Sequence, residues 1–465
     1  MTAVNVVAER PAWAVRARAR WFGFPREAPG VSEMAGLAML ARASVPGENR
    51  ISRARRLLVA ARRLEASASR RALRRALEST KILDDAQGFR DGHIGWERYE
   101  ERDFDMRSRQ LTTSLVLKEP GPNGEKGVLY CSFEYNWMRL LAHYDAKRIL
   151  SEYFLVGASS WSPTDYVGMA NFAGLSRDPL FIGISNRADV AKYRLLSPVV
   201  EPVPLLASDW TLPGYYHPRP HAERDIDVLM VANFLQFKRH WLLFEALRRM
   251  RRDLRVVLIG ISAPGRTADD IRAEARAFGA LQDLEIIPGL PIESVGRHQE
   301  RARVALVFSR REGSCVAVAE ALFAGAPVGM MRDAHVGSKA YINDQTGVLF
   351  QRDGLARALE QFIERSGEYK PRQWADANIT CWRSSAALNA QLRDYSLRAG
   401  LPWTRDIVPF CWRHVPTYAT DAGEAAMAGP TERLRREHGV EIVRRAVPRP
   451  VVQTPGGAVP AVMAQ

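Results

Sequence analysis

A regular alternation of short apolar segments and helical segments between residues 226 and 366 constrains the fold of this chain more than any other feature. Runs of branched apolar residues predict six buried strands, at 226–232, 254–260, 284–289, 303–309, 327–331 and 346–350. Helical patterns separate most of these strands, at 240–250, 267–279, 292–302, 315–325 and 354–366. Strands joined by single helices run parallel, because each crossover returns the chain over the sheet. We therefore predict a parallel α/β sheet covered on both faces, with ligands at the carboxyl ends of its strands.

The preceding part of the chain predicts a second α/β unit. Five apolar segments there have the pattern of short buried strands, at 111–118, 127–133, 151–158, 179–185 and 199–206. Between the two units, Pro213, Pro218 and Pro220 disfavour both helix and strand and predict a linker. The sequence thus predicts an Arg/Ala-rich helical extension at 1–100, an N-terminal Rossmann-like domain at 101–206 and the linker at 207–225. A C-terminal ligand-binding domain at 226–400, a helical segment at 401–440 and a disordered tail at 441–465 follow.

The charge of the chain is strongly basic but unevenly distributed. It has 66 Lys and Arg residues against 52 Asp and Glu residues, and the net charge of +14 invites a nucleic-acid partner. Residues 1–75 hold 16 Arg, 5 Glu and no Lys, a net +11, which leaves +3 for the rest. Because no helix-turn-helix, zinc finger or aromatic-rich RNA motif accompanies this charge, no nucleic-acid partner is expected.

Two interpretations of the basic extension stay open. Leu57 and Leu64 share one face of the helical pattern, whereas Leu73 and Leu77 fall among arginines, so the pattern is less cleanly amphipathic than that of a membrane-surface helix. Residues 1–80 are either a solvated helical segment that packs on the body, or a peripheral anchor for an anionic membrane or another polyanion.

The sequence predicts a cytoplasmic protein, with the extension offering peripheral attachment to the inner face of the membrane. The N-terminus lacks the apolar core of a secretory signal, and no apolar stretch approaches the roughly 18 residues of a membrane span. The four cysteines are widely spaced and form no C-x-x-C pair, at Cys131, Cys315, Cys381 and Cys411. This spacing argues against a disulfide framework and favours reduced thiols.

A strand–turn–helix motif at 303–325 brings two carboxylates to the predicted ligand edge. Glu312 lies in the turn after the strand, and Glu320 lies in the middle of an apolar helix that we expect to be buried. A buried carboxylate is costly without a cation or a set of hydrogen-bond donors. Gly313 and Ser314 place backbone N–H groups at a helix N-terminus, which binds anions. A ligand with both phosphate and hydroxyl groups, such as a phosphorylated sugar, fits this combination.

Cations follow the first strand of the same unit. Lys238 and Arg239 lie in the turn after 226–232, at the same edge of the sheet, where they suit the phosphates of a nucleotide. Gly260 ends the next strand and permits close approach of a ligand or base.

No metal site is predicted. The two Asp-x-Asp strings, Asp103/Asp105 and Asp225/Asp227, suggest a metal-dependent transferase at first sight. In such metal-dependent transferases the metal-chelating aspartates follow the carboxyl end of a strand, whereas Asp225 and Asp227 precede a strand. His143, in a predicted helix, is a candidate acid or base on the acceptor side, although a lone helical histidine is more often structural.

Residues 226–366 resemble the donor domain of the retaining GT-B glycosyltransferases of family 4, also called glycosyltransferase group 1. Their signature is two glutamates separated by seven residues, which Glu312 and Glu320 match. Lys238 matches the family's diphosphate-binding lysine. The segments AGAPVG at 324–329 and VGSKAYINDQTGVLF at 336–350 also resemble the family, in the expected order.

The resemblance implies a GT-B fold, in which two Rossmann-like domains face a cleft, and a transferase that uses a nucleotide-sugar donor with retention and without a metal or other cofactor. The implied acceptor is a carbohydrate or lipid-linked molecule. Glu312 would lie by the donor sugar hydroxyls, Glu320 would hold the ribose hydroxyls, and Lys238 would neutralise the diphosphate as the glycosidic bond breaks. The predicted catalytic residues are Glu312 and Lys238. The residues predicted to bind the donor are Glu320, Gly313, Ser314, Cys315, Arg239, Asn233 and Gly260.

Departures from the family pattern keep two alternatives open. Asn233 stands where the family usually has Arg, and residues 312–315 read Glu-Gly-Ser-Cys where the family commonly has Glu-Gly-Phe-Gly. The N-terminal domain also has no Gly-Gly loop. The alternatives are a nucleotide-sugar epimerase of GT-B architecture and a catalytically weak protein that binds nucleotide sugars or carbohydrates.

Overall fold

The fold is known from a computed structural model of the 465-residue chain. The structure describes residues 11–21, 29–47, part of 53–72, 108–158, 175–196, 199–263, 266–413 and 415–444. Most of the predicted tail, 441–465, therefore lies outside the described residues, as do Leu73, Leu77, Asp103 and Asp105.

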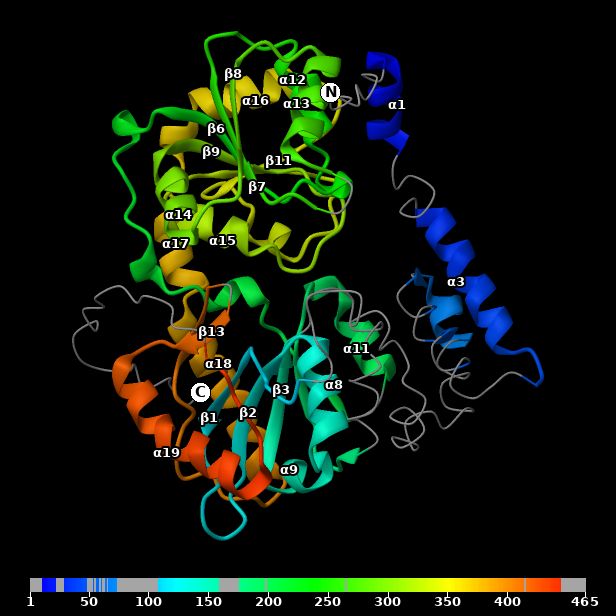
Figure 1. The fold of residues 1–465 in the computed structure, drawn as a ribbon, viewed down its shortest axis with the longest axis vertical. Helices are drawn as coiled ribbons and strands as arrows, with labels where there is room; N and C mark the ends of the chain where they lie inside the picture. The colour runs from blue at the N-terminus through cyan, green and yellow to red at the C-terminus, as the bar shows by residue number, and fades with distance from the viewer. Residues whose placement is uncertain are drawn as a thin grey trace, which may run out of the picture.

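The first domain is built on a five-stranded sheet (Figure 1). Its strands are β1 (Ser114–Lys118), β2 (Gly127–Ser132), β3 (Tyr153–Ala158), β4 (Leu180–Gly183) and β5 (Val200–Val203). They are ordered as in the sequence, with β1 antiparallel to β2 and the others parallel. The strands are almost entirely buried, as their continuous apolar runs predict for a sheet covered on both faces.

One face of this sheet is covered by helices that connect its strands. They are α8 (Glu134–His143), α9 (Ala146–Glu152) and α11 (Val190–Leu196). Trp137 of α8 lies against the sheet, where it donates a hydrogen bond from Nε1 to the Cys131 carbonyl at 2.6 Å. Its ring approaches Gly157 so closely that a Cβ there would lie 2.4 Å from it, so this packing requires glycine.

The other face of the first sheet is covered by the C-terminal part of the chain. This cover comprises α18 (Cys381–Arg398), β12 (Phe410–Arg413) and β13 (Val415–Tyr418). Helix α19 (Asp421–His438) instead lies beside β1, and its Leu434 belongs to the same apolar cluster as Trp137 of α8. Leu388 and Leu392 of α18 share one apolar cluster with Leu115 and Tyr130 of the sheet. This corrects two sequence boundaries. Residues 381–398 belong to the first domain rather than to 226–400, and the stretch 401–440 contains a β-hairpin before its helix.

The second domain has a six-stranded parallel sheet in the order β11-β10-β9-β6-β7-β8. Its strands are β6 (Ile226–Val231), β7 (Arg255–Gly260), β8 (Asp283–Pro288), β9 (Ala302–Val307), β10 (Val328–Met331) and β11 (Gly347–Phe350). All six lie where the sequence predicted strands. The strand order reverses between β6 and β9, which are neighbours, and such a reversal opens a crevice at the carboxyl ends.

Helices cover both faces of the second sheet, as the alternation predicted (Figure 1). They are α12 (His240–Leu247), α13 (Ala268–Phe278), α14 (Ile292–Arg301), α15 (Val316–Phe323), α16 (Leu355–Glu364) and α17 (Pro371–Asn378). The predicted stop of α13 at Gly279 is confirmed, because Gly279 has φ 77°, the left-handed conformation that favours glycine.

Residues 207–225 connect the domains as short 3₁₀ turns rather than as a loose linker. Trp210, Tyr215 and Tyr216 are buried in this stretch, so its aromatic side chains form part of the core. Thr211 forms a β-bridge with Thr380, where the chain returns to the first domain. The two passages of the chain between the domains therefore lie side by side.

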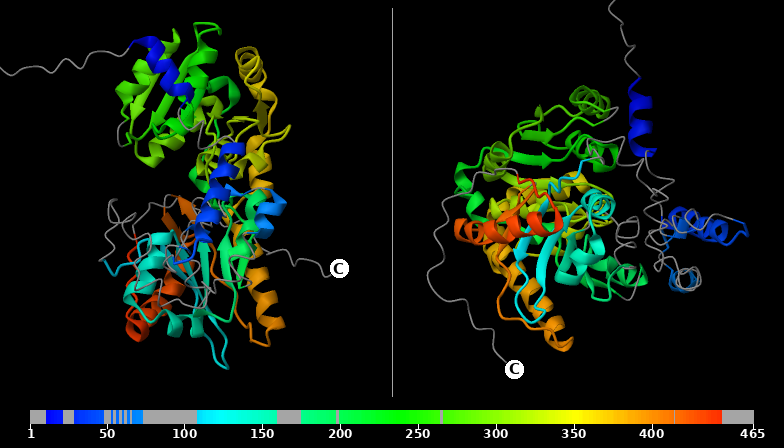
Figure 2. Two further views of the ribbon diagram at one scale, coloured as in Figure 1. Left: turned by 90° about the vertical axis from the view of Figure 1, so that its right-hand side faces the viewer. Right: turned by 60° about the horizontal axis from the view of Figure 1, so that its bottom comes forward.

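The N-terminal extension forms helices, of which α1 contacts the second domain. Helix α1 (Ala12–Trp21) lies along the second domain (Figure 2), and α3 (Pro29–Ala43) follows it. Leu57 and Leu64, which the sequence placed on one helix face, are both buried, although Leu64 itself lies outside a helix. Among the described residues, no helix has the length and apolar character needed to cross a bilayer.

Candidate active site

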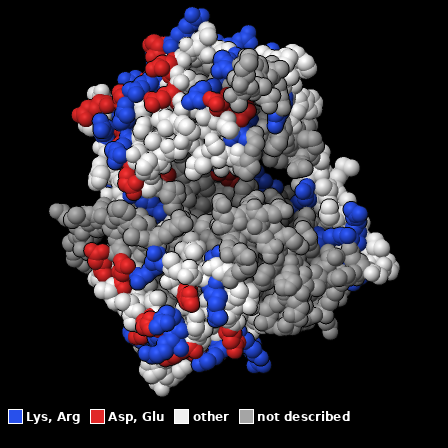
Figure 3. Space-filling view, in the orientation of Figure 1, with Lys and Arg blue, Asp and Glu red and all other residues white. Residues whose placement is uncertain are grey.

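The candidate site lies at the carboxyl edge of the second sheet, where β6 and β9 are neighbours. Figure 3 shows the molecule hollowed between its two domains at this level. The carboxyl edge of the first sheet faces the same hollow. Ser185, shortly after β4, lies so close to Gly337 of the second domain that a Cβ on Gly337 would lie 2.1 Å from the Ser185 carbonyl oxygen. Groups from both domains thus meet at one place.

Lys238 and Glu312, predicted from separate strand ends, form an ion pair. The distance from Lys238 Nζ to Glu312 Oε2 is 2.7 Å, and the two side chains are only 10% and 13% exposed. The second carboxylate oxygen of Glu312, Oε1, is buried and accepts no hydrogen bond from the described residues. The pair thus combines a largely buried cation with a buried carboxylate oxygen that these contacts leave unused.

The turn that carries Glu312 is held by the loop after β10. The Glu312 N–H donates to the His335 carbonyl at 3.0 Å, and the Gly337 N–H donates to the Gly313 carbonyl at 2.8 Å. The Ser338 N–H donates to the Ser314 carbonyl at 3.2 Å. Two loops from adjacent strands therefore position the turn as one rigid unit.

Cys315 stands directly before α15 in a left-handed conformation, with φ 52°. Burial, and next the charge of Glu312, raises the pKa of its thiol. A protonated, buried thiol is a poor nucleophile. Cys315 thus lies beside the Lys238–Glu312 pair, where its side chain packs and its backbone makes the turn into α15.

Glu320 lies inside α15 and is 8% exposed, as its apolar surroundings predicted. The Tyr216 hydroxyl hydrogen-bonds to its carboxylate, and burial, followed by the Glu320 charge, raises the pKa of Tyr216. Arg413 lies over the rings of Tyr215 and Tyr216, with its Cζ 4.0 Å and 5.9 Å from the ring centroids. The Tyr216 hydroxyl therefore offsets part of the cost of burying Glu320.

Two predicted donor-binding residues receive another explanation from the structure. Arg239, with φ 56°, turns away from Lys238 and donates two hydrogen bonds to Asp333, at 2.9 and 3.0 Å. A Cβ on Gly260 would lie 2.2 Å from the Ala232 carbonyl oxygen, so the close approach at Gly260 is made by protein backbone, not by a ligand. Asn233 is half-buried in the loop after β6, and its Oδ1 has no hydrogen-bond partner among the described residues.

Comparison with known families identifies this part of the chain. The family model described as glycosyl transferases group 1 matches residues 217–379, which include β6 to β11, Lys238, Glu312 and Glu320. Residues 217–379 are a glycosyl transferase group 1 domain. This family match confirms the prediction that the chain is a glycosyltransferase. Its two α/β domains facing a hollow also confirm the predicted GT-B architecture.

Several solved structures are similar to this glycosyltransferase. Sucrose-phosphate synthase from Thermosynechococcus elongatus has 15% identity over 59% of this chain and 74% of its own, with a TM-score of 0.44. HepE of Anabaena, in complex with UDP and glucose, has 12% identity over 57% and 78%, with a TM-score of 0.45. The pneumococcal O-GlcNAc transferase GtfA, in complex with UDP and GlcNAc, has 16% identity over 54% of each chain, with a TM-score of 0.37. A comparison with curated protein sequences gives no match.

The structure adds residues to the candidate site that the sequence did not single out. Tyr216 and Arg413 come from the connecting stretch and from the C-terminal hairpin, far from the signature in sequence. Ser338 is buried beside the Glu312 turn, and its Oγ has no hydrogen-bond partner among the described residues. The only sequence signal for Tyr216 was the aromatic and proline-rich character of 207–225.

Other sequence candidates lie away from the transferase site. His143 ends α8, which starts at the carboxyl end of β2 and runs away from the hollow, so its ring lies at the far end of that helix. Asp225 and Asp227 form ion pairs with Arg301 and Arg303 at the amino end of the sheet. Both aspartates therefore have a structural role.

His240, directly after Arg239, makes the stability of the transferase domain dependent on pH. Burial, and next the charges of Arg266 and Lys238, lowers the pKa of its imidazole from 6.5 to about 3. The folded state keeps His240 neutral while the unfolded chain takes up a proton below pH 6.5. Unfolding free energy should therefore fall as pH drops from 6.5 towards 3, by at most about 1.4 kcal/mol per pH unit from this group.

Urea unfolding at pH 7.5 and pH 5.0 tests this prediction. Between these two pH values, the loss of unfolding free energy should be about 2 kcal/mol smaller in His240→Asn than in the wild type. An equal loss in both proteins would contradict a buried neutral imidazole.

Proposed function

We propose that this nucleotide-sugar-dependent glycosyltransferase moves a sugar to a glycan, lipid or other acceptor with retention of anomeric configuration and without a metal. The observation that carries the proposal is the Lys238–Glu312 ion pair at the strand-order reversal, with Glu320 eight residues further on. A cation, a free carboxylate oxygen and a second buried carboxylate together suit a diphosphate, a sugar and a ribose.

Lys238 would stabilise the leaving group. When the bond between sugar and diphosphate breaks, negative charge grows on the diphosphate oxygen, and a fixed ammonium in a partly buried site stabilises that charge without solvent reorganisation. The burial of Lys238 and its fixed position on Glu312 support this role. Breaking the bond between sugar and diphosphate needs no general base on the donor side.

The two glutamates would recognise hydroxyl groups of the donor. Glu312 Oε1 is buried and accepts no hydrogen bond from the described residues, so a sugar hydroxyl could donate to it. Glu320 already accepts from Tyr216, and a ribose hydroxyl could share the same carboxylate. The first domain, whose carboxyl edge faces the hollow, would bind the acceptor.

A panel of donors tests the proposal. We expect a UDP-, GDP- or ADP-sugar to raise the melting temperature, because a ligand at a hundredfold excess over its Kd adds about 2.7 kcal/mol to the stability of the folded state. The donor that binds should lose its sugar slowly to water when no acceptor is present. Conversion of that donor to an epimeric nucleotide sugar would contradict the transferase proposal and favour the epimerase.

We further propose that the extension holds the enzyme on the inner, cytoplasmic face of an anionic membrane. Trp13 and Trp21 of α1 are each 67% exposed and Met34 of α3 is 71% exposed, on a segment rich in arginine. Exposed tryptophans beside arginines are typical of segments that enter the lipid–water interface.

Sedimentation with phosphatidylglycerol vesicles tests this attachment. The variant Trp13→Ala/Trp21→Ala should bind about tenfold or more weakly than wild type, because it loses two large apolar anchors. Leu397→Ala, which removes an exposed apolar side chain from the other end of the fold, serves as control. Equal sedimentation of all three proteins, or none with the wild type, would contradict the proposal.

A further inference from the structure

A cavity of about 470 Å³ lies behind the loop that carries Lys238. Its walls come from α1, from the loop 236–239, from α12 and from the carboxyl ends of β10 and β11. Neither Lys238 nor Glu312 lines it, so it is separate from the candidate active site. A volume of this size is typical of sites for small organic ligands.

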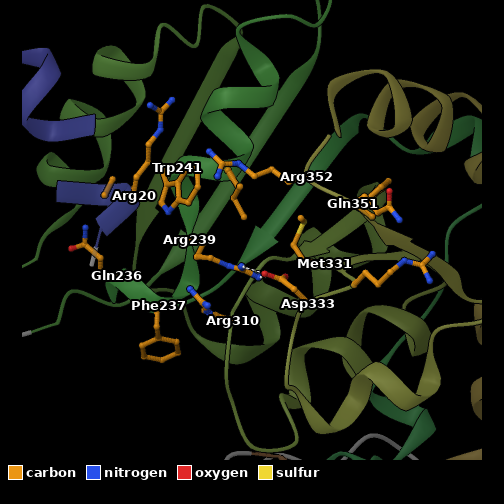
Figure 4. A pocket seen from close by; sticks show the side chains of 14 residues that line it. Arg20, Gln236, Phe237, Arg239, Trp241, Arg310, Met331, Asp333, Gln351 and Arg352 are labelled. Atoms are coloured by element: carbon orange, nitrogen blue, oxygen red, sulfur yellow. Dashed lines mark hydrogen bonds and ion pairs between the residues drawn. The ribbon is translucent and has the colours of Figure 1, made fainter. Parts of the chain in front are cut away.

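The wall of this cavity is strongly basic (Figure 4). Five arginines line it against one acidic residue, Asp333. The arginines are Arg20, Arg239, Arg310, Arg332 and Arg352. Guanidinium groups match the oxygens of phosphate in geometry and charge, and they remain protonated at any physiological pH.

Arg20, Arg332 and Arg352 have few carboxylate partners among the described residues. Asp333 accepts two hydrogen bonds from Arg239. Glu245, which lies outside the lining, pairs with both Arg20 and Arg352. Arg20 and Arg352 thus share one carboxylate, and Arg332 forms no ion pair with another described residue, so an anion would neutralise positive charge on this side of the cavity.

Apart from Gln236 and Gln351, the rest of the wall is apolar, which points to an organic anion rather than an inorganic ion. Trp241 and Leu242 of α12, Met331 and Phe350 supply this surface. Arg352 lies over the Trp241 ring, with its Cζ 5.0 Å from the centroid, so a flat apolar surface and a charged group are presented together.

Helix α1 closes one side of the cavity and is fixed to the second domain. Arg16 donates to the Ala277 carbonyl at 2.6 Å, and Arg20 lies over the Phe278 ring at 5.5 Å. Helix α1 therefore supplies one wall of the cavity, and Arg20 is the charged group that the extension contributes.

From this combination we infer that the cavity is a second binding site, which takes a small organic phosphate between helix α1 and the second domain. The phosphate binds Arg332, Arg352 and Arg20, and the organic part lies against Trp241 and Met331. Arg239 and Lys238 are adjacent in one loop, so a ligand on the Arg239 side also restrains the loop that presents Lys238 to the active site. This inference goes beyond the proposed function and does not depend on it.

Calorimetric titration of the full chain, without a nucleotide sugar, tests the inference. Phenyl phosphate and ribose 5-phosphate are the probes, and phenol and ribose are their uncharged controls. We expect saturable binding of at least one phosphate and none of the uncharged compounds. Arg332→Gln and Arg20→Ala should each weaken binding about tenfold to a hundredfold, the usual cost of one charge-assisted contact.

Two further variants fix the location of the bound phosphate. Arg357→Gln, which alters an exposed arginine on α16 outside the cavity, should bind like the wild type. Lys238→Ala should also retain binding, because its side chain faces Glu312 instead. Absence of saturable binding to the wild type would overturn the inference. Loss of binding in Lys238→Ala with retention in Arg332→Gln would overturn it too, by placing the phosphate in the active site.

Discussion

Lys238→Ala is expected to lower kcat for sugar transfer by about 100- to 1000-fold, the usual effect of removing one donor that stabilises developing negative charge. Glu312→Gln should lower it as well, because it removes the charge that holds the Lys238 ammonium at 2.7 Å. Steady-state transfer rates with the donor selected by thermal stabilisation provide the measurement.

Stability must be separated from catalysis in this experiment. Lys238→Ala leaves the buried Glu312 carboxylate without its cation and should therefore lower the melting temperature. The double variant Lys238→Ala/Glu312→Gln should regain stability but not activity. Lys147→Ala, on the exposed surface of α9, is the matched control. Equal, slow turnover by the wild type, Glu312→Gln and Lys238→Ala would favour a weak binding protein over a transferase.

Phe410→Ala is expected to lower the free energy of unfolding by about 3–5 kcal/mol. The Phe410 ring is fully buried, stacks on Trp210 at 4.1 Å and lies 4.6 Å from Tyr130 of the first sheet. The substitution removes the ring that joins the C-terminal hairpin to the sheet and to the connecting stretch.

Urea denaturation provides the measurement. Leu397→Ala, which removes an exposed side chain from α18, should change the unfolding free energy by less than about 0.5 kcal/mol. A small effect of Phe410→Ala would mean that the C-terminal segment contributes little to the first domain. That result would favour the boundary at residue 400 that the sequence suggested.

The second domain was predictable because strands such as β7 and β9 are buried on both faces and read as uninterrupted apolar runs. The edge strand β8, predicted as buried, is largely exposed. The approach of Lys238 to Glu312 followed from the same pattern, since the carboxyl ends of parallel strands share one edge. Because the donor-domain signature lies within one continuous stretch, the family was also recognisable.

Long-range packing was not predictable from the sequence. The apolar side of α18 could pack on either sheet, and only tertiary structure decides that Leu388 and Leu392 cover the first. The direction of the Arg239 side chain depends on a left-handed backbone conformation that arginine seldom adopts. Its position next to Lys238 in the sequence therefore suggested donor binding, whereas its side chain pairs with Asp333. Tyr216 reaches Glu320 from more than a hundred residues away, a separation at which local patterns give no information.

The covering of the first sheet by the last part of the chain has a consequence for folding during synthesis. Strand β5 ends at Val203 and α18 begins only at Cys381, so roughly 10–35 s of translation separate them at about 5–20 residues per second. Throughout that interval one apolar face of the nascent sheet lacks its natural cover, while the second domain can complete itself on the ribosome. The first domain, whose strands are synthesised before the second domain, therefore finishes folding after it.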